Sequence, residues 1–231
     1  MMRFPRLLGV TLSIVALYGC RSAPITYYTL TPADRSGTPA ESARPAIKAI
    51  VVLRSLPAGI DTPQILFRTD DTQLRVEESG RWVAPLGDEL RGALVDALRH
   101  QYGIIVLDSA RHNDTPVPRI DLTVRKFDLS EGGPIPRRST SGSSDTASSN
   151  PGSSIPARSI SGPSITLAVD WTLSTPGHEP NSALSCQAEF REPSAATVGG
   201  AVAAAQAAIL KLSHTLGAAI AASSNGATPT C

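Results

Sequence analysis

The chain has 231 residues, with 21 Lys+Arg, 20 Asp+Glu and a formal net charge of +1 at pH 7. This balance leaves no basic surplus to neutralise a phosphate backbone, so the composition argues against a nucleic-acid-binding protein. The length is sufficient for one domain with a substantial core and does not require two.

Residues 1–19 have the pattern of an export signal, in which Arg3 and Arg6 precede the apolar residues 7–17. The apolar stretch is shorter than the roughly 20 residues that span a bilayer. The alternative is a buried helix of the folded domain. We predict a signal peptide over residues 1–19. Its removal takes away two basic residues and no acid, which leaves 21 − 2 = 19 basic residues against 20 acidic ones and a mature charge near −1.

The signal ends in the letters LYGC, which resemble a bacterial lipobox, although Tyr18 is bulkier than the usual Ala or Ser at its position. In lipoproteins of this kind the chain is cleaved before the cysteine, whose thiol carries a diacylglycerol and whose amine is acylated. Two or more acyl chains hold a protein firmly on a membrane. The motif therefore predicts Cys20 as the lipidation site and residues 20–24 as a lipidated tether.

Arg21 stands where enteric bacteria place an aspartate to retain lipoproteins in the inner membrane, so the sequence favours the periplasmic face of the outer membrane.

Five strands and one helix are expected in the first half of the chain. The strands are rich in β-branched and aromatic residues or alternate apolar with polar ones, and they comprise residues 25–30, 46–53, 65–68, 73–77 and 104–107. Asp70-Asp71 marks a turn between the third and the fourth. The helix begins at Pro85, presents one apolar stripe and ends at Gly103.

Three more strands and a long helix are expected in the second half, with the strands at residues 119–129, 165–173 and 183–190. Residues 131–164 are rich in Ser, Gly and Pro and poor in core formers, which predicts a disordered loop. The helix begins at Pro193-Ser194 and runs to about Ser223, before a polar tail over residues 224–231. Its apolar residues step by three and four, which is consistent with a coiled-coil seam or with a face packed on the core. We favour the core face, because its alanines allow close approach.

This order of elements predicts an α+β fold. A mostly antiparallel sheet would carry two helices packed on one face, in a single periplasmic domain over residues 25–223.

Signals for an enzyme are scarce. The sequence contains no His-Glu-x-x-His, no Cys-x-x-Cys and no phosphate-binding glycine loop, and its four histidines are scattered through polar surroundings. We therefore predict no catalytic residue, no cofactor-binding site and no metal site.

Once Cys20 is acylated, Cys186 and Cys231 remain, and the periplasm permits a disulfide between them. The alternative is one buried thiol and one free thiol at the terminus.

Several segments taken together resemble the family of ABC-type transport auxiliary lipoproteins. They are the paired tyrosines Tyr27-Tyr28, the strand pair with an aspartate turn over residues 68–76, Trp82 with Pro85 shortly after it, and the leucine-containing helix over residues 86–98. The resemblance covers most of residues 25–222 and rests on order and spacing. The Ser-rich residues 131–164 depart from the compact family pattern.

The resemblance implies a non-enzymatic lipoprotein of the PqiC-like kind, which accompanies ABC transporters and MCE-domain proteins in moving lipid between membranes. The expected partners are an MCE-domain periplasmic protein, ABC transporter subunits, the membrane through the anchor, and further copies of the chain in a ring. Tyr27, Tyr28 and Trp82 are the candidates for a shared surface, unless they pack over the sheet. The alternative is a stand-alone periplasmic lipoprotein that binds a small ligand or acts as an enzyme, which requires a concave pocket with convergent polar groups.

The length of the tether depends on where the fold begins. If Ile25 already belongs to the sheet, residues 21–24 reach at most about 14 Å from the lipid anchor. If order begins only at Ala46, about 25 residues reach roughly 85 Å. The first case predicts a domain held close to the membrane, and the second a mobile one.

Overall fold

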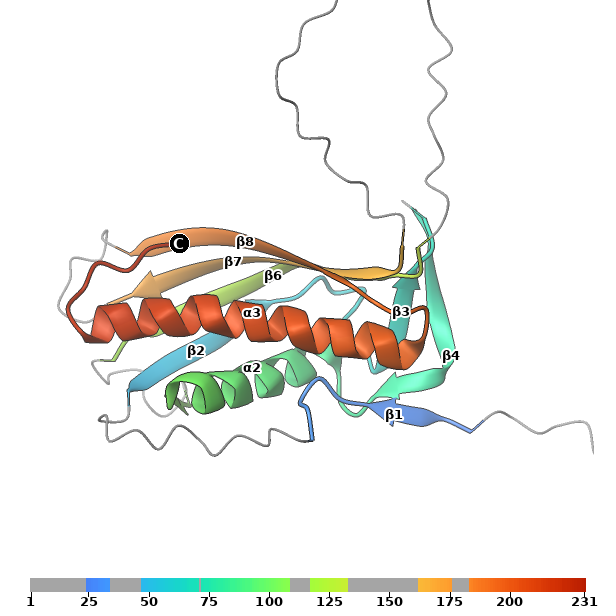
Figure 1. The fold of residues 1–231 in the computed structure, drawn as a ribbon, viewed down its shortest axis with the longest axis horizontal. Helices are drawn as coiled ribbons and strands as arrows, with labels where there is room; N and C mark the ends of the chain where they lie inside the picture. The colour runs from blue at the N-terminus through green and yellow to red at the C-terminus, as the bar shows by residue number, and fades with distance from the viewer. Residues whose placement is uncertain (1–23, 34–46, 71, 109–116, 133–161, 176–182) are drawn as a thin grey trace, which may run out of the picture.

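Eight strands and two helices form in the part of the chain that the computed structural model describes, which is residues 24–33, 47–70, 72–108, 117–132, 162–175 and 183–231 (Figure 1). In chain order they are β1 (Thr26–Tyr28), β2 (Lys48–Ser55), β3 (Gln64–Arg68), β4 (Leu74–Trp82), α2 (Leu86–Tyr102), β5 (Ile105–Leu107), β6 (Arg119–Ser130), β7 (Ser164–Ser174), β8 (Leu184–Pro193) and α3 (Val198–Ser224). Each strand and helix predicted from the sequence has a counterpart here.

Strand β6 is the centre of the sheet. Along one edge it pairs antiparallel with β7, which pairs antiparallel with β8. Along its other edge, the first half of β6 pairs parallel with β2, where Ile120 lies opposite Val51, and its end pairs parallel with β3, where Leu129 lies opposite Phe67. The sheet therefore divides into two arms at this edge, one continuing from β2 to β5 and the other from β3 through β4 to β1.

The sheet is mixed, with parallel pairing in four of the seven strand pairs that the structure describes. The prediction of a mostly antiparallel sheet was wrong. It assumed that strands adjacent in the sequence also pair in space, which holds only for β3–β4, β6–β7 and β7–β8. The chain instead returns through α2 to place β5 and β6 parallel to β2 on either side, and such crossovers are the usual source of parallel pairs.

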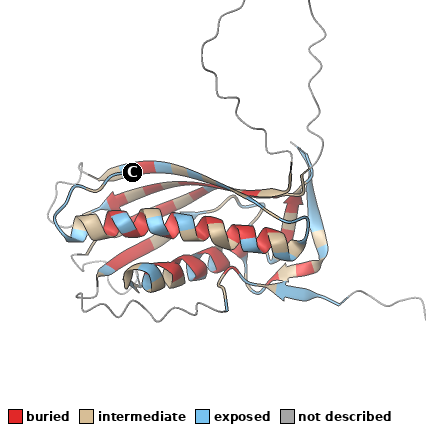
Figure 2. Ribbon diagram, viewed as in Figure 1, coloured by how far each residue is buried: buried red, intermediate tan, exposed pale blue. Residues whose placement is uncertain are grey.

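Both helices cover the same face of the sheet and lie side by side (Figures 1 and 2). The core lies between the two layers, where alternate residues of the long strands meet the apolar faces of the helices. The opposite face of the sheet carries ion pairs instead, including Arg54 with Asp121 and Arg125 with Asp170. The prediction of an α+β fold with two helices on one face is confirmed.

Local signals position the ends of the helices. Helix α2 ends at Gly103, whose φ of 65° is the left-handed conformation that glycine adopts without strain. Its first turn receives a cap from a distant loop, since the Asp61 carboxylate accepts a hydrogen bond of 2.9 Å from the Gly87 N–H. Helix α3 begins at Val198, later than the predicted start, because β8 extends to Pro193 and the Thr197 hydroxyl caps the Gly200 N–H.

The alanine-rich helix α3 packs on the sheet and on α2 at short range. At Gly217 an added Cβ would lie 2.3 Å from the ring of Tyr102, so only glycine fits there unless the ring moves. The Tyr102 hydroxyl donates to the His214 carbonyl at 3.1 Å, and the Ser213 hydroxyl donates to Gln101 at 2.9 Å. The interpretation of the apolar spacing as a core face is confirmed, because the buried residues of α3 belong to the main core. Within the described ranges, neither helix combines the length and the apolar character needed to cross a bilayer.

Candidate functional site: the N-terminal edge

Strand β1 is the first described element and lies at the edge of the sheet. It runs parallel to β4, with Thr26 opposite Gly80 and Tyr28 opposite Trp82, and the Val83 N–H donates to the Tyr28 carbonyl at 3.0 Å. The fold therefore begins at β1, and not at Ala46. Only residues 21–25 separate it from Cys20, and five residues reach at most about 18 Å.

The three aromatic candidates for a partner surface have different environments. Tyr27 is 64% exposed on the outer edge, whereas Tyr28 is half-buried and packs against the core beside Gly80. Trp82 is only 2% exposed and meets the Phe127 ring edge-on, with ring centroids 6.4 Å apart. The prediction of a surface role for Trp82 was wrong, since its indole fills the core and is not accessible to a partner.

Two side chains from the helices hold the segment that follows β1, and we call them the latch: Glu89 of α2 and Gln206 of α3. One carboxylate oxygen of Glu89 accepts from the Leu30 N–H and from the Thr29 hydroxyl, each at 2.8 Å. The Gln206 amide donates to the Thr29 carbonyl at 3.1 Å. Glu89 is buried, so its two bonds satisfy a carboxylate that would otherwise be costly to remove from water.

Sequence reasoning missed the latch. In the sequence Glu89 looks like one of two acids that suit the first turn of a helix. Its partners lie 59 and 60 residues away, and the partner of Gln206 lies 177 residues away. No local pattern connects them. The only signal was the apolar Leu30 after the tyrosines, which the structure buries to 1% exposure.

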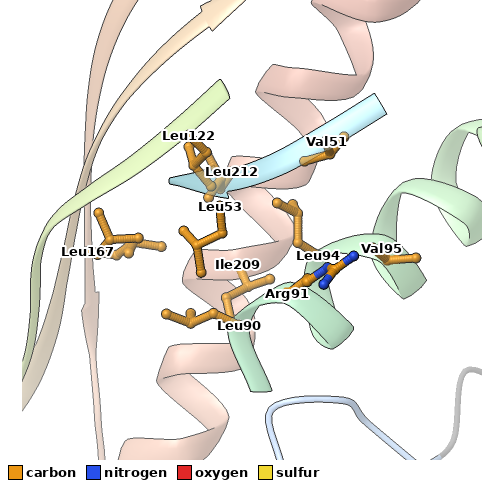
Figure 3. A pocket seen from close by; sticks show the side chains of 11 residues that line it. Val51, Leu53, Leu90, Arg91, Leu94, Val95, Leu122, Leu167, Ile209 and Leu212 are labelled. Carbon is orange, nitrogen blue, oxygen red and sulfur yellow. The ribbon is translucent and has the colours of Figure 1, made fainter. Parts of the chain in front are cut away.

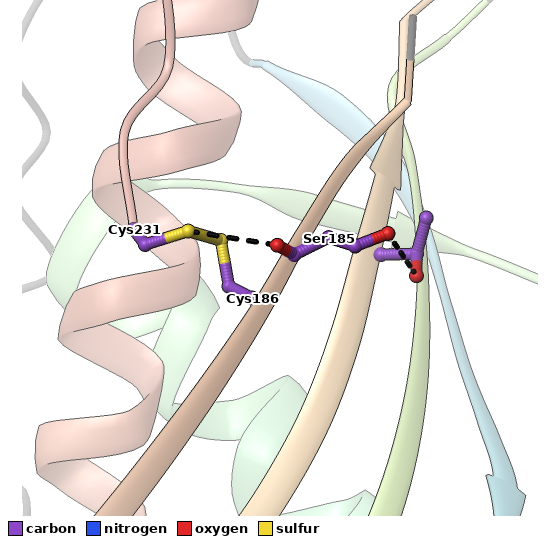
Figure 4. Close-up of a disulfide and its surroundings, with 4 residues drawn as sticks. Ser185, Cys186 and Cys231 are labelled. Carbon is purple, nitrogen blue, oxygen red and sulfur yellow. Dashed lines mark hydrogen bonds between the residues drawn. A yellow bond between two sulfur atoms is a disulfide. The ribbon is translucent and has the colours of Figure 1, made fainter. Parts of the chain in front are cut away.

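At the other end of the molecule a disulfide ties the C-terminus to the edge strand β8 (Figure 4). Cys186 and Cys231 are joined with an S–S distance of 2.02 Å and a Cα–Cα distance of 5.5 Å. Cys186 lies opposite Trp171 of β7, and both are buried on the helix side of the sheet. The bridge thus closes a loop that contains all of α3.

The β3–β4 hairpin carries a turn and an array of opposite charges. The Asp70 carboxylate accepts from the Thr72 N–H, the Thr72 hydroxyl and the Gln73 N–H, as in an Asx turn. These bonds, the Thr72 N–H first among them, hold the pKa of Asp70 below its ordinary value. The prediction of a turn at Asp70 is confirmed.

Further along the hairpin, the Arg75 guanidinium lies 5.4 Å from the centre of the Phe67 ring and pairs with Glu77 and Glu131. The hydrogen bond to Glu131 raises the pKa of Arg75, and the hydroxyl of Ser79 is the main cause that lowers the pKa of Glu77. Acids thus surround this cation, and the arrangement suits a solvated surface better than a site for an anion.

An apolar crevice lies between the sheet and the two helices (Figure 3). Aliphatic side chains of both layers line it, among them Leu53, Leu122, Leu94 and Ile209, with Arg91 beside them. Its volume of about 20 Å³ is enough for about one water molecule. As it stands in this structure, the crevice therefore has no room for an acyl chain.

Within the described ranges no group of three or more His, Cys, Asp or Glu side chains converges as metal ligands would. His100 pairs with Asp96 one turn earlier on α2, and His214 meets the ring of Tyr102. Several predictions concern residues outside the described ranges. They are the signal peptide predicted over residues 1–19, the lipidation site predicted at Cys20, and the disordered loop, most of which is outside. The remaining two histidines also lie outside.

These features define a two-layer α+β domain whose N-terminal strand is fixed to both helices. Residues 28–136, from β1 to just beyond β6, match the family described as ABC-type transport auxiliary lipoprotein component. This match confirms the resemblance noted in the sequence. The family consists of lipoproteins that serve ABC-type transport systems as auxiliary components.

Two solved structures show the same fold. A crystal structure of protein XCC0632 from Xanthomonas campestris, of the family DUF330, superposes with a TM-score of 0.53 at 18% identity, covering 89% of this chain and 97% of that one. A crystal structure described only as an uncharacterized protein gives a TM-score of 0.54 at 14% identity, covering 84% and 97%. At these identities the likeness concerns the fold alone. A search of curated proteins found no significant match.

Proposed function

We propose that the chain is an auxiliary subunit of an intermembrane lipid transport system of the ABC and MCE type, anchored through Cys20 to the periplasmic face of the outer membrane. In this proposal it acts without catalysis, by holding a partner at a fixed distance from the membrane. The observation that carries the proposal is the family match over residues 28–136, together with the latched β1.

The geometry supports a docking role better than a lipid-carrying role. A carrier needs a cavity that encloses most of its ligand, whereas the apolar crevice between the helices and the sheet holds about one water molecule. The larger hollows among the described residues are open and have polar or charged side chains in their walls. A docking subunit needs a defined distance between its anchor and its folded part. Residues 21–25 supply a short tether, and the latch fixes its folded end.

The test is purification of the tagged chain from native membranes in mild detergent, with co-purifying proteins and lipids identified by mass spectrometry. A Cys20→Ala variant serves as the matched control. We expect an MCE-domain protein in stoichiometric amount with the native chain and less of it with the variant. A chain that purifies alone with a tightly bound small molecule would contradict the proposal and favour a stand-alone ligand-binding lipoprotein or enzyme.

A further inference from the structure

We propose that the outer side of the β1–β4 edge, formed by Ile25, Tyr27 and Val83, lies in the headgroup region of the membrane that holds the anchor. This inference rests on the proposed lipidation of Cys20. It adds a membrane-contact surface on the folded domain itself, in addition to the acyl chains. We call these three residues the edge patch.

The edge patch contains the three most exposed large apolar side chains of the described residues. Val83 is 63% exposed, Tyr27 64% and Ile25 53%, whereas the next is Val76 at 48%. Such side chains are ordinary when scattered singly, but a cluster at one edge marks a surface for a partner or a membrane.

The pairing of β1 with β4 brings the three residues to the same edge of the sheet. Tyr27 lies opposite Arg81 in the parallel ladder. Ile25 directly precedes β1, and Val83 directly follows β4, where its N–H donates to the Tyr28 carbonyl. Both side chains are exposed, as Tyr27 is. Tyr28 and Trp82 alternate with them and point into the core.

The tether determines which occupant suits the edge patch. Ile25 follows Cys20 by five residues and so lies no more than about 18 Å from it. The edge patch is therefore the part of the described fold that starts closest along the chain to the proposed anchor. Tyrosine is enriched at the headgroup level of membranes, where its ring is covered and its hydroxyl stays hydrated.

Arg81 beside Tyr27 fits the same environment. Its guanidinium donates to the carbonyls of Glu77 and Gly80, which keeps the charge at this edge of the sheet. A positive charge at the headgroup level is favourable where anionic lipids are present.

A second copy of the chain suits the edge patch less well. Stable protein interfaces bury about 800 Å² per partner, which is more than three side chains provide. Strand β1 has only three residues, so its free edge also offers few backbone groups for pairing with another strand. Contact with a membrane needs no large area, because the anchor already holds the domain there.

The experiment places a fluorescent reporter in the edge patch of the full lipidated chain. Tyr27→Trp is reconstituted into vesicles of phosphatidylcholine and phosphatidylglycerol, with or without bromine on the acyl chains. The matched control is Val76→Trp, at the other end of β4, where the native side chain is also exposed. The native Trp82 and Trp171 are 2% and 1% exposed and contribute the same background to both. Val83→Trp is a second reporter should Tyr27→Trp fold poorly.

We expect brominated lipid to remove most of the added emission of Tyr27→Trp and little of that of Val76→Trp. Equal loss in the two variants, with Cys20 shown by intact mass to be acylated, would overturn the inference and leave the proposed function standing. Shielding of Tyr27→Trp that depends on protein concentration in detergent, with no bromine effect in vesicles, would also overturn it and indicate contact between copies. An unacylated Cys20 would refute the anchor and this inference together.

Discussion

Removal of the Glu89 carboxylate is expected to release the segment that follows β1. The Glu89→Ala substitution deletes two hydrogen bonds of 2.8 Å and leaves the buried Leu30 N–H without its acceptor. Hydrogen bonds to charged groups contribute about 1.5–3 kcal/mol each, and the two share one oxygen atom, so we expect a loss of about 3 kcal/mol.

The assay combines urea unfolding with hydrogen exchange at the Leu30 amide. Glu89→Gln is the matched control, since its amide oxygen can still accept both bonds without the charge, and we expect a loss of about 1 kcal/mol for it. For Glu89→Ala the exchange rate of Leu30 should rise by roughly a hundredfold, because each loss of about 1.4 kcal/mol in the opening free energy raises the open population tenfold. If Leu30 exchanges equally slowly in Glu89→Ala and in the native chain, the reasoning about the latch is refuted.

Three further predictions concern the helices, the tail and the hairpin. Gly217→Ala should stabilise α3 by about 1 kcal/mol through helix propensity and destabilise the fold by about 1–3 kcal/mol through overpacking against Tyr102. We therefore expect a lower free energy of unfolding in urea. Gly199→Ala, which would meet no atom within 4 Å, should leave stability unchanged or raise it, and equal effects at both sites would contradict the packing argument. Cys231→Ser removes the disulfide that closes a loop with a sequence separation of 45, and it should lower the free energy of unfolding by up to about 4 kcal/mol. Equal stability of the variant and the native chain under oxidising conditions would argue against the bridge. Asp70, whose pKa is lowered in the folded state, stabilises the fold above its unfolded pKa and loses that contribution as the pH falls through the folded value. Asp70→Asn should therefore show a shallower loss of stability in acid-unfolding curves, and an unchanged acid slope would refute this.

The sequence predicts where the elements lie because each one carries its own signal. The helix from Leu86 to Tyr102 has an apolar stripe and a glycine stop, and β6 and β7 alternate apolar with polar residues along their length. These signals are local, so they can be recognised in the sequence without knowing which elements pack against one another.

Pairing and burial depend on contacts that no local pattern contains. The apolar run of β2 indicates a strand inside the sheet, but it does not distinguish a parallel neighbour from an antiparallel one. Trp82 illustrates the same limit, since an aromatic residue at the end of a strand suits either a surface or a core. Its packing on Phe127, far along the chain, decides the matter.

The latch helps to keep the proposed tether short. Strand β1 alone has three residues, and so short a strand at an edge is weakly held. The bonds from Glu89 and Gln206 connect the residues just after it to both helices, so the proposed anchor at Cys20 would be coupled to the helix layer. If the latch opens and β1 also separates from β4, the link from Cys20 to the paired strands lengthens from residues 21–25 to residues 21–46, since Ile47 is the next described residue after Ala33. Its greatest reach then grows from about 18 Å to about 85 Å. A subunit that must hold a partner at a fixed distance from the membrane would lose that distance while keeping its anchor and most of its fold, which makes Glu89→Ala a sharper test of docking than Cys20→Ala.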